Sequence, residues 1–142
     1  MVNLRQAGRN IVIVQSSRSD CISLAGLARD EGAVVRFAQS GREALRLARR
    51  GERAVWLIGV ELADMSGLDL CHMLRQKLNR PAICMVAGQY DAADEAASYR
   101  RGATFYACES PDASWLKQCV RQLHTAATRR QVPAGSEMGA PE

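Results

Sequence analysis

The chain has 142 residues, of which 47% are hydrophobic and 24% are charged, and its formal net charge is +4. This length and balance predict one globular domain with a sizeable core and exclude a natively disordered chain. No apolar run approaches the ~20 residues of a membrane-spanning helix, and the first ten residues lack the apolar stretch of a secretory signal. The five cysteines include no C-x-x-C pair. We therefore expect buried thiols in a reducing cytoplasm rather than a metal site.

Short apolar runs alternate with amphipathic segments along the chain. The runs predict strands over residues 11–14, 34–38, 54–60, 82–87 and 104–108. The segments between them predict helices over 20–31, after Ser40, after Ser66, from Asp91 and after Asp112. Five strands that alternate with five helices through short connections predict a parallel, doubly wound α/β sheet.

One folded domain accounts for most of the chain. Residues 1–9 are expected to form an N-terminal extension and residues 130–142 a disordered, polar C-terminal tail, which leaves 10–129 as the domain. In such sheets the functional crevice lies beyond the carboxyl ends of the strands, where the strand order reverses. The helix after Ser66 is expected to turn four apolar residues inward, namely Leu70, Met73, Leu74 and Leu78.

Two motifs lie in the middle of the chain. Residues 32–45 read GAVVRFAQSGREAL and fit the pattern G-x-x-V-x-x-A-x-x-G-x-E-A-L, and residues 62–70 read LADMSGLDL and resemble L-P-x-M-[DS]-G-x-x-L. Both patterns are typical of the receiver domains of two-component response regulators, which the chain resembles over roughly residues 10–128. The resemblance implies a flavodoxin-like (CheY-like) sheet with strand order 2-1-3-4-5 and five helices.

The family's phosphorylation site is where the chain departs from the pattern. Receivers carry acidic residues after strand one, an acceptor aspartate after strand three, a hydroxyl after strand four and a lysine after strand five, and they bind magnesium. The corresponding positions here hold Gln15, Ser16, Gly59, Val86 and Glu109, and the glycine lies eight residues before Gly67 of the second motif. Without the nucleophile and the carboxylates, we expect a pseudo-receiver with no phosphotransfer, no enzyme activity, no metal and no cofactor.

A shifted alignment would make Glu61 the phosphoryl acceptor. It requires the deletion of two residues from a loop that otherwise matches in length, and glutamate is not a usual acceptor. We therefore expect Glu61 not to be phosphorylated. Glu61 and Glu109 are expected to be the only acidic side chains near the crevice, which predicts a magnesium affinity too weak to matter in a cell.

The resemblance and the lost site together predict cytoplasmic, phosphorylation-independent signalling through protein contacts. The expected contact surface is formed by the helix from Asp91, the strand over 104–108 and the helix after Asp112, with Tyr99, Tyr106 and Trp115 as its candidate residues. Tyr106 matches the aromatic residue that family members rotate as they switch. Since Val86 replaces its hydroxyl partner, we expect a static, half-buried Tyr106 whose hydroxyl is satisfied by solvent. The partner would be a kinase, an effector or another regulator, and a homodimer stays open.

A different class of function, a small-ligand or anion sensor, also stays open. Ser16, Ser17 and Arg18 precede a helix N-terminus beside the vacant crevice and could hold an anion. The loop has no glycine, however, which restricts close approach of its backbone to a phosphate. Capping and surface roles are therefore the interpretation that the residue types favour.

Two further groups of residues are interpreted as surface residues. The arginines on or just after the second predicted helix favour a solvated helix face over a nucleic-acid surface, because no groove-entering motif or stacking aromatic accompanies them. These arginines are Arg42, Arg46, Arg49, Arg50 and Arg53. His72 and His124 have no carboxylate or cysteine at ligand spacing.

Overall fold

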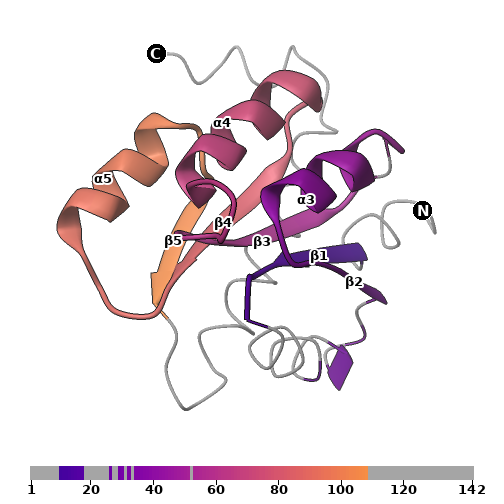
Figure 1. The fold of residues 1–142 in the computed structure, drawn as a ribbon, viewed down its shortest axis with the longest axis horizontal. Helices are drawn as coiled ribbons and strands as arrows, with labels where there is room; N and C mark the ends of the chain where they lie inside the picture. Colours follow the sequence, from indigo (N-terminus) through magenta and orange to yellow (C-terminus); the bar gives the residue numbers. More distant parts are fainter. Residues whose placement is uncertain are drawn as a thin grey trace, which may run out of the picture.

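The computed structural model describes residues 10–17, 26, 29–30, 32, 34–51 and 53–108. Within them five parallel strands form one sheet in the order β2-β1-β3-β4-β5, which confirms the expected order (Figure 1). The strands are β1 (Asn10–Val14), β2 (Val34–Ala38), β3 (Val55–Gly59), β4 (Ala82–Ala87) and β5 (Phe105–Cys108). Each predicted strand is present, and the observed bounds differ from the predicted ones by at most one residue at either end.

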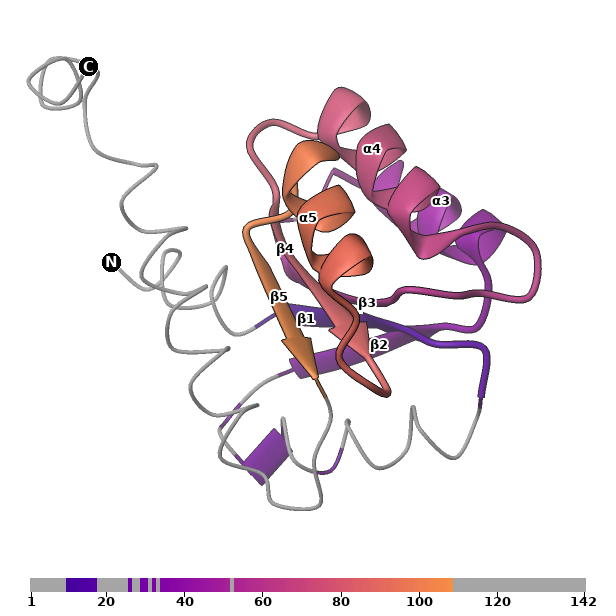
Figure 2. The same cartoon turned by 90° about the vertical axis from the view of Figure 1, so that its left-hand side faces the viewer.

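Three helices lie together on one face of this sheet. They are α3 (Gly41–Ala48), α4 (Gly67–Lys77) and α5 (Ala92–Arg100), and α4 runs between the other two (Figure 2). The predicted helix after Asp112, the N-terminal extension and the C-terminal tail lie outside the described residues, as does most of the predicted helix over 20–31. None of the described helices is long and apolar enough to cross a membrane.

The core forms where alternate residues of the strands meet the helices. Val12, Trp56 and Ile83 are in register across three neighbouring strands, and all three belong to the buried cluster that also contains Leu70 and Leu74 of α4. The intervening strand residues are buried as well, among them Ile11, Ile13, Val55 and Leu57. Burial of both sets explains why these strands read as continuous apolar runs rather than as alternating patterns.

The predicted helix starts have the expected hydrogen bonds. The Ser40 hydroxyl accepts from the Glu43 N–H at 3.1 Å, and the Ser66 hydroxyl accepts from the Leu68 N–H at 3.1 Å. Asp91, expected in the first turn of α5, is its N-cap, and its Oδ1 accepts from the Asp94 N–H at 3.0 Å. Each side chain satisfies a backbone donor that has no partner inside the helix.

The inner face of α4 differs from the expected one at one position. Met73 is 37% exposed, whereas Cys71 is fully buried beside Leu70 and Leu74. Adjacent helical positions differ by about 100° around the axis, so the direction that buries Cys71 and Leu74 turns Met73 outward. Met73 and Cys71 both fit the apolar stripe of α4, and the orientation of the helix buries the smaller of the two.

The cysteines in the described residues have no disulfide partner among themselves. Cys71 and Cys84 are buried, which confirms the expected buried thiols at these two positions, and Cys108 is half-buried. Burial raises the pKa of Cys71 to about 11, so this thiol stays protonated at neutral pH. Cys21 and Cys119 lie outside the described residues.

The start of α4 packs directly on the end of β3. The Gly67 N–H donates to the Val60 carbonyl at 2.7 Å, and a Cβ on Gly67 would collide with the carbonyl oxygen of Gly59. This obstacle is backbone rather than a flexible side chain, so it cannot move aside without distorting β3. Glycine is therefore required at this position for steric reasons.

We expect Gly67→Ala to lower the free energy of unfolding by about 3 kcal/mol, the upper end of typical overpacking costs. Gly88→Ala is the matched control, because a Cβ at Gly88 would meet nothing within 4 Å. Urea unfolding followed by circular dichroism measures both changes. Equal stability of the two variants would contradict the packing described at Gly67.

Candidate functional site

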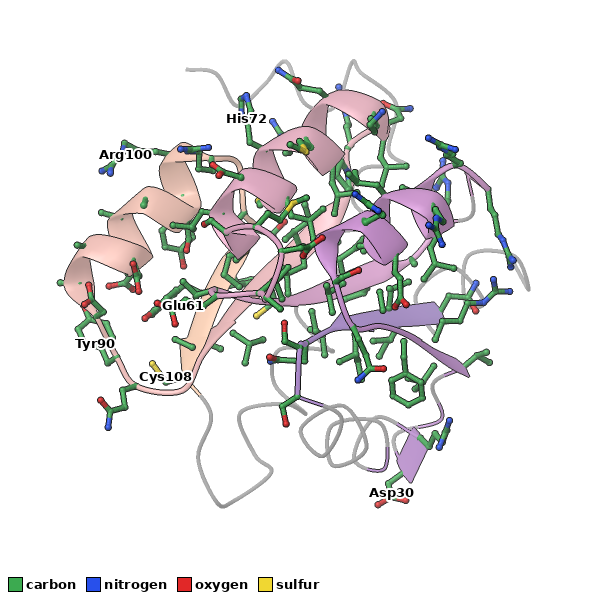
Figure 3. All side chains as sticks on the ribbon, viewed as in Figure 1. Asp30, Glu61, His72, Tyr90, Arg100 and Cys108 are labelled. Atoms are coloured by element: carbon green, nitrogen blue, oxygen red, sulfur yellow. The ribbon has the colours of Figure 1, made fainter. Side chains whose placement is uncertain are left out.

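A crevice of about 470 Å³ lies at the carboxyl ends of β1, β3 and β4, where the sequence placed the functional site. It brings together three of the predicted positions, Gln15, Gly59 and Val86. Its remaining lining comes from the segments that follow β3 and β4, namely Val60, Glu61, Ala87, Gly88, Gln89, Tyr90, Asp91 and Asp94. Figure 3 shows Glu61, Tyr90 and Cys108 at this end of the sheet, whereas His72 points away from it.

The side chain of Gln15 occupies the space above Gly59. A Cβ built on Gly59 would lie 2.5 Å from the Gln15 Oε1 and 3.0 Å from its Cδ. Gln15 is only 8% exposed, and its backbone N–H donates to the Ala38 carbonyl at 3.1 Å, which fixes it at the end of β1. A side chain at position 59 would thus displace this buried amide.

The neighbouring strand presents an apolar side chain to the site. Val86 is paired with Gly59 across β3 and β4, and it is 2% exposed. Its carbonyl accepts from the Val60 N–H at 3.2 Å, which holds the end of β3 against β4. Position 86 therefore offers packing but no side-chain hydrogen bond to a ligand.

Ser16, just after β1, forms a hydrogen bond with the loop between β3 and α4. Its hydroxyl oxygen accepts from the Ala63 N–H at 2.7 Å, across 47 residues of sequence. This bond ties the loop between β3 and α4 (residues 60–66) to the strand that carries Gln15. Ser17 is exposed, and Arg18, Glu109 and Trp115 lie outside the described residues, so the predicted anion-binding group is described only at Ser16 and Ser17.

The crevice is more acidic than expected. Asp91 and Asp94 line it together with Glu61, so the expectation that only Glu61 and Glu109 lie nearby was wrong. The reason is geometric, since α5 begins close to the end of β4, with Asp91 as its N-cap and Asp94 in its first turn. Among the described residues, no three His, Cys, Asp or Glu side chains are arranged to hold a metal ion.

Tyr106 is held by contacts on two sides. Its hydroxyl oxygen accepts from the Asp91 N–H at 3.1 Å, and its ring packs edge-on against Tyr90 with centroids 6.0 Å apart. Burial raises the pKa of Tyr106, and the hydrogen bond to Glu95 raises the pKa of Tyr90. Tyr106 is half-buried as expected, but a backbone donor rather than solvent satisfies its hydroxyl. The hydrogen bond and the ring contact together give the Tyr106 ring a defined position.

The other predicted contact residue on α5 lies apart from this pair. Tyr99 is near the C-terminal end of α5 and is 47% exposed. Tyr90, just before the helix, is 61% exposed although its hydroxyl donates to the Glu95 Oε1 at 2.7 Å. The two exposed tyrosines therefore mark opposite ends of the same helix.

The protein family of the chain follows from its match to a family model. The model of the response regulator receiver domain matches residues 11–108, which contain the whole described sheet and its crevice. The chain belongs to the receiver domain family. Receiver domains are the signalling domains of two-component systems, and they interact with kinases or effectors.

Individual relatives agree with this assignment. A response regulator receiver protein from Anaeromyxobacter sp. (strain Fw109-5) is 34% identical over 93 residues, which are 66% of this chain and 39% of that protein. The chain thus spans about two fifths of the length of this relative. A protein described as a response regulator from Chloroflexus aurantiacus J-10-fl has a TM-score of 0.78 and 25% identity, and the match covers 82% of this chain and 98% of that one.

A third relative supports the fold alone. The signal receiver domain of a protein described as a Luxo repressor from Vibrio parahaemolyticus has a TM-score of 0.79. Its sequence identity is 20%, and the match covers 87% of this chain and 95% of that chain.

One residue that organises this receiver domain was missed in the sequence. Asp64 lies in the loop between β3 and α4, and its two carboxylate oxygens accept from the Gly41 N–H at 2.9 Å and the Arg42 N–H at 3.1 Å. It therefore caps the N-terminus of α3 from a different part of the chain. No local sequence pattern predicts such a cap, because Asp64 and Gly41 are 23 residues apart in the sequence.

The pH dependence of stability provides a test of this cap. The hydrogen bond from the Gly41 N–H is the main cause that lowers the pKa of Asp64 from its usual value. Because the pKa is lower in the folded state, the stabilisation is present above the unfolded-state pKa and is lost as the pH falls through the folded-state pKa.

We expect Asp64→Asn to unfold at a lower urea concentration than the wild type at pH 7, with a difference that shrinks as the pH falls below about 4. Glu61→Gln removes an exposed carboxylate from the same loop and serves as the control. A difference between wild type and Asp64→Asn that stays constant from pH 7 to about pH 2 would contradict the role given to the ionised cap.

Proposed function

We propose that this receiver domain signals by protein contacts without being phosphorylated. The observation that carries the proposal is the buried amide of Gln15 packed over Gly59. By the motif spacing, position 59 corresponds to the family's acceptor aspartate, and glycine has no atom that could attack a phosphoryl donor. A phosphoryl group would also have to displace a side chain that is 8% exposed.

The charges around the crevice support the same proposal. Glu61, Asp91 and Asp94 would repel a phosphoryl donor unless a cation lay between them. By alignment, the lysine that would contact the phosphoryl oxygens is Glu109, and the hydroxyl is Val86. Neither residue can donate a hydrogen bond to a phosphoryl oxygen when the glutamate is ionised.

The contact surface that we propose consists of α5, β5 and the predicted helix after Asp112. Tyr106 supports a single resting conformation, because the Asp91 N–H and the Tyr90 ring both hold it. A receiver switches when a ligand binds one of two conformations more tightly, and here no phosphoryl group is anchored to provide that difference. The partner, a kinase, an effector or another regulator, would then recognise the resting surface.

We expect acetyl phosphate with magnesium to add no phosphoryl group to this chain, because it has no acceptor at position 59. Intact-mass spectrometry measures this directly, with a receiver domain that retains its aspartate as the positive control. Gly59→Asp alone should also stay unmodified, since the magnesium ligands and the lysine are still missing. A stoichiometric, base-labile phosphoryl adduct on the wild-type chain, mapped to Glu61 or Asp64, would overturn the proposal.

We expect Tyr106→Ala, Tyr99→Ala or Trp115→Ala to weaken partner binding by about 1–3 kcal/mol wherever the aromatic side chain anchors the interface. The partner is first isolated from the native cell, and its affinity for each purified variant is then measured by calorimetry. Val34→Ala is the control, since Val34 is 59% exposed on β2, away from this surface. Gly59→Asp should leave the affinity unchanged. Full binding by all three aromatic variants would refute the assigned surface.

The crevice itself supports a second candidate, a small-ligand sensor. Its volume of about 470 Å³ suits a small molecule, and the three carboxylates in its described lining favour a cationic or neutral ligand over an anion. Thermal shift with nucleotides, inorganic phosphate and small amines distinguishes the two candidates, because a ligand stabilises the state that it binds. Partner binding that requires such a ligand, and that survives the aromatic substitutions, would favour the sensor.

A further inference from the structure

A second hollow lies beside α3, and its lining shares no residue with the crevice. It has a volume of about 460 Å³ between α3 and the loop of residues 60–66, and we call it the arginine groove. Its lining consists of Arg42, Leu45, Arg46, Arg49, Asp64 and Met65, none of which lines the crevice. In Figure 1, α3 and α5 lie on opposite sides of α4, so the groove is separate from the α5–β5 surface.

The sequence of α3 places its arginines in one row. Arg42, Arg46 and Arg49 are spaced four and three residues apart, which puts them on one face of the helix. Arg49 follows the last helical residue but keeps helical backbone angles, with φ −63° and ψ −22°. The row therefore extends over about 10 Å along the axis, at a rise of about 1.5 Å per residue.

The positive charge of this row has little compensation within the described residues. There, no ion pair involves Arg46 or Arg49, and all three arginines of the row are exposed. Among the described residues of the lining, Asp64 is the one that is acidic, and both its oxygens already accept N–H groups of α3. The groove thus combines two guanidinium groups that have no ion-pair partner in the described part of the chain, those of Arg46 and Arg49, with a carboxylate that already caps a helix.

The floor of the groove is apolar. Leu45 and Met65 are half-buried and pack against the core, so each offers part of its surface to the groove. Met65 covers the start of α3, where a Cβ on Gly41 would meet its Sδ. A ligand that fits must therefore carry negative charges in a row and an apolar group beside them.

We propose that the arginine groove binds an acidic amphipathic helix of a partner protein. Glutamates spaced like the arginines would pair with the row, and an adjacent leucine would cover Leu45 and Met65. Guanidinium groups form paired, directional hydrogen bonds with carboxylates, and arginine is enriched at protein interfaces. A nucleic acid fits less well, since the described residues of the groove lining include no stacking aromatic and contain the negative charge of Asp64.

The test uses a synthetic peptide on the full chain. The probe is a fluorescein-labelled helical peptide with glutamates at i, i+4 and i+7 and leucine at i+3, and the control peptide replaces each glutamate by glutamine. Binding is read as fluorescence anisotropy near physiological salt. Arg42→Gln/Arg46→Gln/Arg49→Gln removes the row, and Arg50→Gln/Arg53→Gln is the matched control, because both of these exposed arginines lie outside the groove lining.

We expect the triple variant to bind the glutamate peptide at least about tenfold more weakly, which is a loss of about 1.4 kcal/mol in binding free energy. The double variant should change the affinity less than about threefold, which corresponds to about 0.65 kcal/mol. Thermal unfolding of each variant shows whether it is folded. Four results would overturn the proposal: no binding of the glutamate peptide, equal binding of both peptides, equal weakening by both variants, or tighter binding of duplex DNA than of the peptide. Self-association that only the triple variant abolishes would assign the groove to a second copy of the chain and would also overturn it.

Discussion

The close contact between Gly67 and the end of β3 is the constraint on which the crevice and the arginine groove both depend. It folds the loop of residues 60–66 back onto the sheet, with the Gly67 N–H on the Val60 carbonyl. The same loop is tied to β1 through Ser16 and to α3 through Asp64. One loop thus positions the crevice on one side and the arginine groove on the other, so the geometry of both depends on a position that has no side chain.

The residues at the positions that we assign to the phosphorylation site are physically consistent with one another. A receiver with its carboxylates in place must hold several negative charges close together, which is costly unless a cation compensates them. Here Gly59 leaves room for the Gln15 side chain, and a buried neutral amide costs little when it is hydrogen-bonded. This arrangement avoids the charge repulsion that a metal ion would otherwise have to compensate, which agrees with the proposed absence of phosphotransfer.

The fold was predictable because its signals are local. Short apolar runs predicted all five strands, and Ser40, Ser66 and Asp91 predicted three helix starts that the structure describes. The positions of Gln15, Gly59 and Val86 in one crevice followed from the topology, since the carboxyl ends of parallel strands meet at one edge.

The features that the sequence did not reveal depend on contacts between distant residues. The Asp64 cap joins positions 23 residues apart, and the Tyr106 hydroxyl meets a backbone donor 15 residues away. The acidity of the crevice was missed for the same reason, because Asp91 and Asp94 come close to Glu61 only once α5 is placed above β4. Met73 shows a different limit, since both it and Cys71 fit the apolar stripe of α4 and only the helix orientation decides between them.

The most direct test of phosphorylation-independent signalling is an amide NMR spectrum recorded with and without beryllofluoride and magnesium, which together mimic an acyl phosphate. A chain that has no acceptor and one resting conformation should show no saturable shifts at Gly59, Val86 or Tyr106. Saturable shifts that extend from the crevice through Tyr106 into α5 would show that the site still binds a phosphoryl group and still switches, and would contradict the proposed function.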